Sequence, residues 1–196
     1  MAHASGHPVA IHCVTRTQLV LATTALHEAR RGPGGDRIEH GAVIPAELIP
    51  RLRDLKVTVV TQPNFVAERG DDYLRSVEPD DLGNLWRGAS LVRAGVAVAG
   101  GTDAPFGSPD PWSALRAATT RLTPTGRCLG ADERVDVETA LGWWTGTGGA
   151  PGSPRRVEVG GPADLVILGS PVEDVVTRRV EPEVVATVVA GTVIHP

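Results

Sequence analysis

The sequence predicts an α/β fold in which parallel strands alternate with helices, amounting to about half of a TIM-type barrel, followed by short strands of a small second sheet. Four short apolar runs, at residues 9–13, 37–41, 57–61 and 95–103, are separated by segments with helical spacing. This alternation favours a parallel sheet with right-handed crossovers. A closed eight-stranded barrel typically needs about 250 residues, and the chain has 196. About four strand–helix units therefore fit.

The first units have recognisable boundaries. After the strand at 9–13, a helix is expected over 17–31 with Thr17 as its cap, and the glycines of 32–35 end it. The next helix is expected to begin at Pro45, although Pro50 implies either a kink or a later start. Residues 65–83 are polar and acidic with no clear period, which predicts a long loop at the mouth of a site.

The second part of the chain changes character after three more predicted helices, at residues 84–94, 111–122 and 135–147. A Gly- and Pro-rich linker at 148–154 precedes short β-type runs at 157–161, 163–168 and 184–193. We therefore expect two domains, with half of a barrel over 1–147 and strands of an accessory β-sandwich over 148–196.

Composition excludes several classes of partner. Nineteen basic residues against 23 acidic ones give a net charge of −4, which offers no basic face for nucleic acid. No apolar run reaches the length of a bilayer, and residues 1–8 lack the apolar centre of a signal peptide. Two cysteines are too few for a disulfide framework. The expectation is a cytoplasmic protein that contacts neither nucleic acid nor membrane.

Three potential metal ligands follow strands of the predicted sheet: His12, His40 and Asp103. The carboxyl ends of parallel strands converge, and α/β folds place their chemistry there. Imidazole and carboxylate ligands suit Zn²⁺, which lowers the pKa of its water to about 7 and yields a metal-bound hydroxide. Asp103 is the expected acid/base, taking the proton of the water and passing it to the leaving group.

Each of these residues also has an ordinary structural explanation. His12 would serve as a hydrogen-bonded core histidine, His40 as a helix-capping residue, and Asp103 as a turn former or helix cap before Pro105. Their matching positions on a strand–helix repeat favour the metal site over three separate structural roles. The remaining histidines lie in tail or mid-helix positions to which we assign no role: His3, His7, His27 and His195.

The order of several motifs resembles the carboxyl-terminal half of the amidohydrolase superfamily, most closely its third family, which includes enzymes similar to N-substituted formamide deformylase. The segments that carry the resemblance are VAIHC (9–13), RIEHG (37–41), VTVVTQP (57–63), VAVAGGTDAP (96–105), GGPADLVIL (160–168) and VVAGTVIH (188–195). By resemblance, His12 and His40 are metal ligands after the fifth and sixth barrel strands, and Asp103 is the ligand and proton shuttle after the eighth.

The resemblance also implies a reaction and its partners. It implies metal-dependent hydrolysis of carbon–nitrogen bonds other than peptide bonds in a small amide-type substrate, with one or two divalent ions. Gln62 and its neighbour Asn64 fall where the family commonly meets substrate, at the close of the seventh strand. The tail matches a β-sandwich that these enzymes build from both ends of the chain.

The sequence departs from the family pattern at the first and fourth strands. The paired histidines written His-x-His have no counterpart, and Lys56 lies at the wrong end of a strand to act as a bridging ligand. One alternative is a hydrolase completed by self-association or by a separate amino-terminal half, because half a barrel exposes unpaired strand edges. The other is a truncated, non-catalytic remnant or a metal-binding module without turnover.

Overall fold

A computed structural model describes residues 2–29 and 32–195. It divides into two compact units, Met1–Pro154 and Arg155–Pro196. The first unit contains a four-stranded sheet and the second a three-stranded one.

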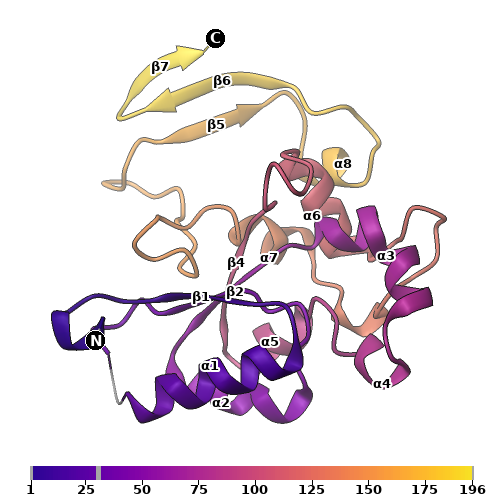
Figure 1. The fold of residues 1–196 in the computed structure, drawn as a ribbon. Coiled ribbons are helices and arrows are strands. Elements are labelled where there is room, and N and C mark those ends of the chain that lie inside the picture. Colours follow the sequence, from indigo (N-terminus) through magenta and orange to yellow (C-terminus); the bar gives the residue numbers. More distant parts are fainter. Residues whose placement is uncertain (1, 30–31, 196) are drawn as a thin grey trace. The chain divides into compact units, whose positions relative to one another are not determined.

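The sheet of the first unit is parallel throughout, which confirms the predicted α/β class (Figure 1). Its spatial order, β1-β2-β3-β4, is also the order along the chain. Each strand is shorter than expected by one or more residues. The observed strands are β1 (Ala10–Cys13), β2 (Arg37–His40), β3 (Thr58–Thr61) and β4 (Ala97–Gly100).

The strand register separates an apolar face from a mixed one. Ile11, Ile38, Val59 and Val98 lie side by side across the four strands, and the last three are buried. Because side chains alternate between the two faces, the neighbouring row lies on the opposite face. That row consists of His12, Glu39, Val60 and Ala99.

Helices α1 (Arg16–Glu28), α2 (Ile49–Leu55) and α5 (Ala89–Arg93) lie on one side of this sheet (Figure 1). Leu19 of α1, Leu52 of α2 and Leu91 of α5 are completely buried. Burying such side chains stabilises the unit by roughly 1.5–3 kcal/mol each. These leucines are one part of the core of the first unit, and another is the buried cluster that includes Phe65, Val66 and Trp86.

Two helix starts differ from the sequence expectation. Thr15, and not Thr17, caps α1: its hydroxyl accepts from the Gln18 amide nitrogen, while the Gln18 side chain accepts from the Thr15 amide nitrogen. This reciprocal arrangement is a capping box. Pro50 lies in the first turn of α2, where a missing N–H costs nothing, so the helix starts late and has no kink. The predicted α1 end at 30–31 lies outside the described residues.

The predicted loop at 65–83 is wrong, because this segment forms α3 (Asn64–Ser76) and α4 (Pro79–Leu82). α3 packs against α6 (Pro111–Thr120). The Asp71 carboxylate also accepts hydrogen bonds from the hydroxyls of Thr123 and Thr125, each at 2.7 Å. In proteins, most helical stability comes from such tertiary packing. Residues 64–76 therefore form a helix although they are mostly polar and have no long apolar stripe.

The other predicted helices of the first unit are also shorter than expected. Residues 84–94 yield only α5, because Trp86 adopts a left-handed backbone (φ 47°) that no helix continues through. α7 (Val137–Gly142) begins at the expected cap, Asp136, whose carboxylate accepts from the Thr139 amide nitrogen at 2.7 Å. A single 3-10 turn, η3 (Ala131–Glu133), precedes it.

The second unit is an antiparallel sheet of β5 (Leu165–Leu168), β6 (Val184–Val189) and β7 (Thr192–His195), with the short α8 (Val172–Val176) between β5 and β6. The run expected as one strand over 184–193 is a hairpin instead. Ala190 and Gly191 both have positive φ, as a tight two-residue turn requires. The strand expected at 157–161 is wrong, since Gly161 closes a turn onto Glu158.

Within the described residues, the helices are all too short or too polar to span a bilayer.

Candidate metal centre

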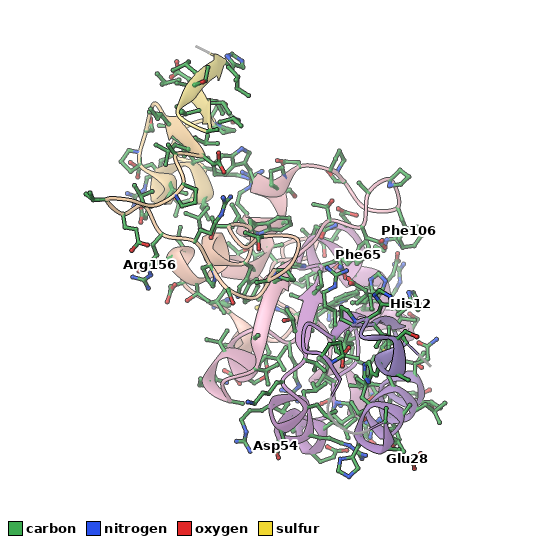
Figure 2. All side chains as sticks on the ribbon, turned by 90° about the vertical axis from the view of Figure 1, so that its left-hand side faces the viewer. His12, Glu28, Asp54, Phe65, Phe106 and Arg156 are labelled. Carbon is green, nitrogen blue, oxygen red and sulfur yellow. The ribbon has the colours of Figure 1, made fainter. Side chains whose placement is uncertain are left out.

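The imidazoles of His12 and His40 meet at the carboxyl ends of β1 and β2. Their ring centroids lie 4.5 Å apart with the planes at 75°, an edge-to-face arrangement. His12 is exposed and His40 is 8% exposed. Figure 2 shows His12 nearer to Phe65 and Phe106 than to Glu28 and Asp54. The structure therefore brings together two of the three predicted ligands.

Regular strand geometry would not have produced this contact. His12 is paired with Glu39, and His40 with Cys13, so simple alternation places the two imidazoles on opposite faces. His40 has a left-handed backbone (φ 71°), and Gly41 follows with φ 55°. Such a conformation is uncommon for a non-glycine residue and costs roughly 1–3 kcal/mol. It ends the strand and turns the His40 side chain toward His12.

Gln62 holds the buried imidazole from the next strand. Its Oε1 lies 2.9 Å from His40 Nδ1, and its Nε2 donates to the Val60 carbonyl at 3.1 Å. Asn64 is likewise buried, and its Nδ2 donates to the Thr102 carbonyl at 3.1 Å and to Glu68 Oε1 at 3.0 Å. Both predicted substrate-binding amides are thus engaged with protein groups, and their contact with substrate stays a prediction.

Asp103 lies in the loop after β4 and also has a left-handed backbone (φ 56°). Its carbonyl accepts from the amide nitrogens of Phe106 (2.8 Å) and Gly107 (3.0 Å), so the residue does form a turn. The carboxylate is partly exposed and makes no hydrogen bond or ion pair within the described part of the chain. The Asp103 backbone therefore forms a turn, whereas its carboxylate has no partner among the described residues.

The start of α3 anchors the Asp103 loop on both sides. Asn64 binds the Thr102 carbonyl, and Glu68 Oε1 accepts from the Ser108 amide nitrogen at 3.1 Å. Glu68 was missed in the sequence because residues 65–83 were expected to be irregular, and Asn64 was expected only as a contact with substrate. The four-residue spacing of Asn64 and Glu68, typical of one helix face, was the available signal.

Arg69, also on α3, supports the tip of the same loop. Its guanidinium lies 3.8 Å from the Phe106 ring centroid and 4.9 Å from that of Phe65, and its Nη2 donates to the Phe106 carbonyl at 2.9 Å. Phe106 is nevertheless 63% exposed. The loop thus presents an aromatic ring to solvent three residues after Asp103.

The donors fit only part of a metal centre. Among residues 2–29 and 32–195, no group of three or more His, Cys, Asp or Glu side chains is arranged to hold an ion. Catalytic zinc sites commonly have three protein ligands and an open position. The adjacent imidazoles of His12 and His40 fit as the nitrogen ligands of such a site. Lys56, the C-cap of α2, is exposed at the amino end of β3, as expected.

Comparison with known proteins identifies the family of this chain. The sequence profile described as the amidohydrolase family matches residues 1–195. The chain belongs to the amidohydrolase family. The superfamily resemblance noted in the motifs is thereby confirmed.

Individual relatives of this amidohydrolase chain are considerably longer than it is. N-substituted formamide deformylase from Arthrobacter pascens is 27% identical over 208 residues, covering 95% of this chain and 36% of the relative. Putative amidohydrolase YtcJ from Bacillus subtilis (strain 168) is 26% identical, with 99% and 38% covered. An uncharacterized metal-dependent hydrolase from Pyrococcus horikoshii OT3 superimposes with a TM-score of 0.64 at 28% identity, covering 74% and 29%. The chain spans less than two fifths of its curated relatives.

Proposed function

We propose that this chain supplies part of the catalytic centre of a metal-dependent amidohydrolase that cleaves a carbon–nitrogen bond, other than a peptide bond, in a small amide-type molecule. The observation that carries the proposal is the His12–His40 pair, two imidazoles in contact at the carboxyl ends of adjacent parallel strands. Family membership and similarity to metal-dependent hydrolases support the hydrolase class. The name of the A. pascens relative supports an amide-type substrate.

In this proposal each residue has a distinct task. His12 and His40 hold a divalent cation, for which zinc suits the nitrogen donors. A bound cation of this kind supplies Lewis-acid activation of water and of the scissile carbonyl. Asp103, with its unengaged carboxylate, takes a proton from the attacking water and returns it to the leaving nitrogen. The parallel sheet is then half of a barrel over 1–147, and the remaining ligands come from outside the described residues.

A metal-binding module without turnover is the second candidate. One observation favours it: among residues 2–29 and 32–195, the two histidines are joined by no third donor to complete a metal-binding group. Such a module would bind an ion through the two histidines but leave amides intact.

Zinc titration by calorimetry, followed by hydrolysis assays with N-formyl and N-acyl amines, tests both candidates. We expect one zinc site in the unaltered chain, lost in His12→Ala and in His40→Ala but retained in His27→Ala, which removes an exposed histidine of α1. Zinc-dependent hydrolysis that disappears in Asp103→Asn supports the hydrolase. Binding without hydrolysis supports the module, and zinc binding that does not need His12 and His40 overturns both.

A further inference from the structure

We propose that Gln62 is a positioning residue that fixes the tautomer of His40 and leaves Nε2 of that imidazole as its metal-binding nitrogen. The inference rests on the proposed function for the identity of the ligand. It rests on hydrogen-bond geometry for the tautomer itself, and the two parts are tested separately.

The orientation of the Gln62 amide follows from its neighbour. One end of the amide lies 3.1 Å from the Val60 carbonyl oxygen. A carbonyl oxygen only accepts hydrogen bonds, so this end must be the NH₂ group. The opposite end, which lies 2.9 Å from His40 Nδ1, is therefore the amide oxygen. A flipped amide would put two acceptors together at Val60.

The amide oxygen in turn determines which ring nitrogen carries the proton. Because Gln62 Oε1 can only accept, His40 Nδ1 must donate, and it therefore bears hydrogen. A neutral imidazole has one N–H, so Nε2 retains its lone pair. A hydrogen bond from the ring nitrogen that faces away from a metal is the usual means of orienting a histidine ligand and raising its basicity. Here the chain from Val60 through Gln62 to His40 provides that bond.

Burial makes this arrangement persistent. Gln62 is 3% exposed and His40 8% exposed, so water has little access to compete for either atom. Gln62 directly follows β3, and His40 ends the adjacent β2. The acceptor and the ring are therefore held by neighbouring strands of one sheet. The exposed His12 ring has the edge-to-face contact with His40 but no hydrogen bond to any residue that the structure describes.

The same geometry gives Gln62 a role other than the predicted contact with substrate. Both polar ends of its amide already have protein partners. Each end of the amide can still make one further hydrogen bond. Orienting His40 therefore uses contacts that the fold itself provides and does not depend on a substrate.

The tautomer is measured directly by long-range ¹H–¹⁵N correlation spectra of the metal-free chain labelled at histidine. We expect His40 to carry its proton on Nδ1 in the unaltered chain. Gln62→Leu removes the acceptor, so the Nε2–H form should appear. Thr61→Val is the matched control, because the buried Thr61 hydroxyl makes no hydrogen bond to the described residues.

Zinc affinity provides the second measurement on the same variants. Loss of an orienting partner typically weakens metal binding about 10- to 100-fold, so we expect that loss in Gln62→Leu and no change in Thr61→Val. A proton on Nε2 in the unaltered chain overturns the inference, as does an unchanged affinity in Gln62→Leu. A proton on Nδ1 in a chain whose histidines bind no zinc instead overturns the proposed function.

Discussion

Two sets of polar residues in the first unit are held in opposite ways. The rim set, His12, His40 and Asp103, includes one exposed imidazole and one carboxylate that has no hydrogen bond or ion pair with the described residues. The buried set, built around Arg121 and Glu133, has a fixed partner for almost every polar atom. The charges of the buried set stabilise the fold, whereas the groups of the rim set are available to bind a ligand.

The buried set shows how completely a charge can be compensated. The Arg121 side chain, 1% exposed, donates to the carbonyls of Leu129 (2.9 Å), Trp86 (2.6 Å) and Leu85 (2.9 Å). Burial lowers the pKa of Arg121 to about 10, so the guanidinium stays charged at neutral pH. The side chain connects the end of α6 to the segment before α5.

Glu133 is compensated in the same manner. Its carboxylate accepts from Arg87 Nη1 (2.6 Å), from the amide nitrogens of Gly88 and Ser90, and from the Ser90 hydroxyl. Burial alone would raise the pKa of Glu133, but the Ser90 and Gly88 hydrogen bonds and the Arg87 charge together hold it below its usual value. The residue thereby fixes the start of α5.

The largest expected effect is that of Arg121→Met, which fills similar volume but leaves three buried carbonyls without their donor. A buried acceptor left without its donor costs about 1–3 kcal/mol, so three of them should lower the free energy of unfolding in urea by about 3 kcal/mol or more. Arg127→Met, at an exposed position of the following loop, should change it by less than about 0.5 kcal/mol. A loss below about 1 kcal/mol in Arg121→Met would contradict the structural role.

Glu133→Gln should have the next largest effect, about 2–3 kcal/mol at pH 7, because hydrogen bonds to a charged group are replaced by weaker ones. The depressed folded-state pKa adds stability above the unfolded value, about 4.3, which is lost as pH falls through the folded-state value. The difference between the unaltered chain and Glu133→Gln should therefore shrink in acid. Glu138→Gln, in the exposed first turn of α7, is the control; a constant difference from pH 7 to pH 3 would refute the linkage.

The smallest expected effect, and one of opposite sign, is at the rim. Asp103→Gly relieves a left-handed backbone and should stabilise the chain by up to about 1 kcal/mol, while removing any activity that needs the carboxylate. Ala104→Gly, at the next and exposed position, should be slightly destabilising because glycine only adds unfolded-state freedom there. Destabilisation by Asp103→Gly larger than that of Ala104→Gly would place Asp103 among the structural residues.

The sequence was sufficient to predict the strands, because they depend on local patterns of apolar residues. Four apolar runs located β1 to β4 to within a few residues, and their shared direction placed His12 and His40 at one end of the sheet. It could not show that the imidazoles touch, since that contact depends on the left-handed backbone of His40. Nor could it show α3, because the contacts of Asp71 with Thr123 and Thr125 join positions more than 50 residues apart.

The double attachment of the loop after β4 has a consequence for how new specificities could evolve. Asn64 and Glu68 bind the backbone at Thr102 and Ser108, so one helix holds both ends of this loop. Replacements at the exposed positions 104–106 would leave both attachments intact. Side chains next to Asp103, Phe106 among them, could therefore change without loosening the loop that carries the carboxylate.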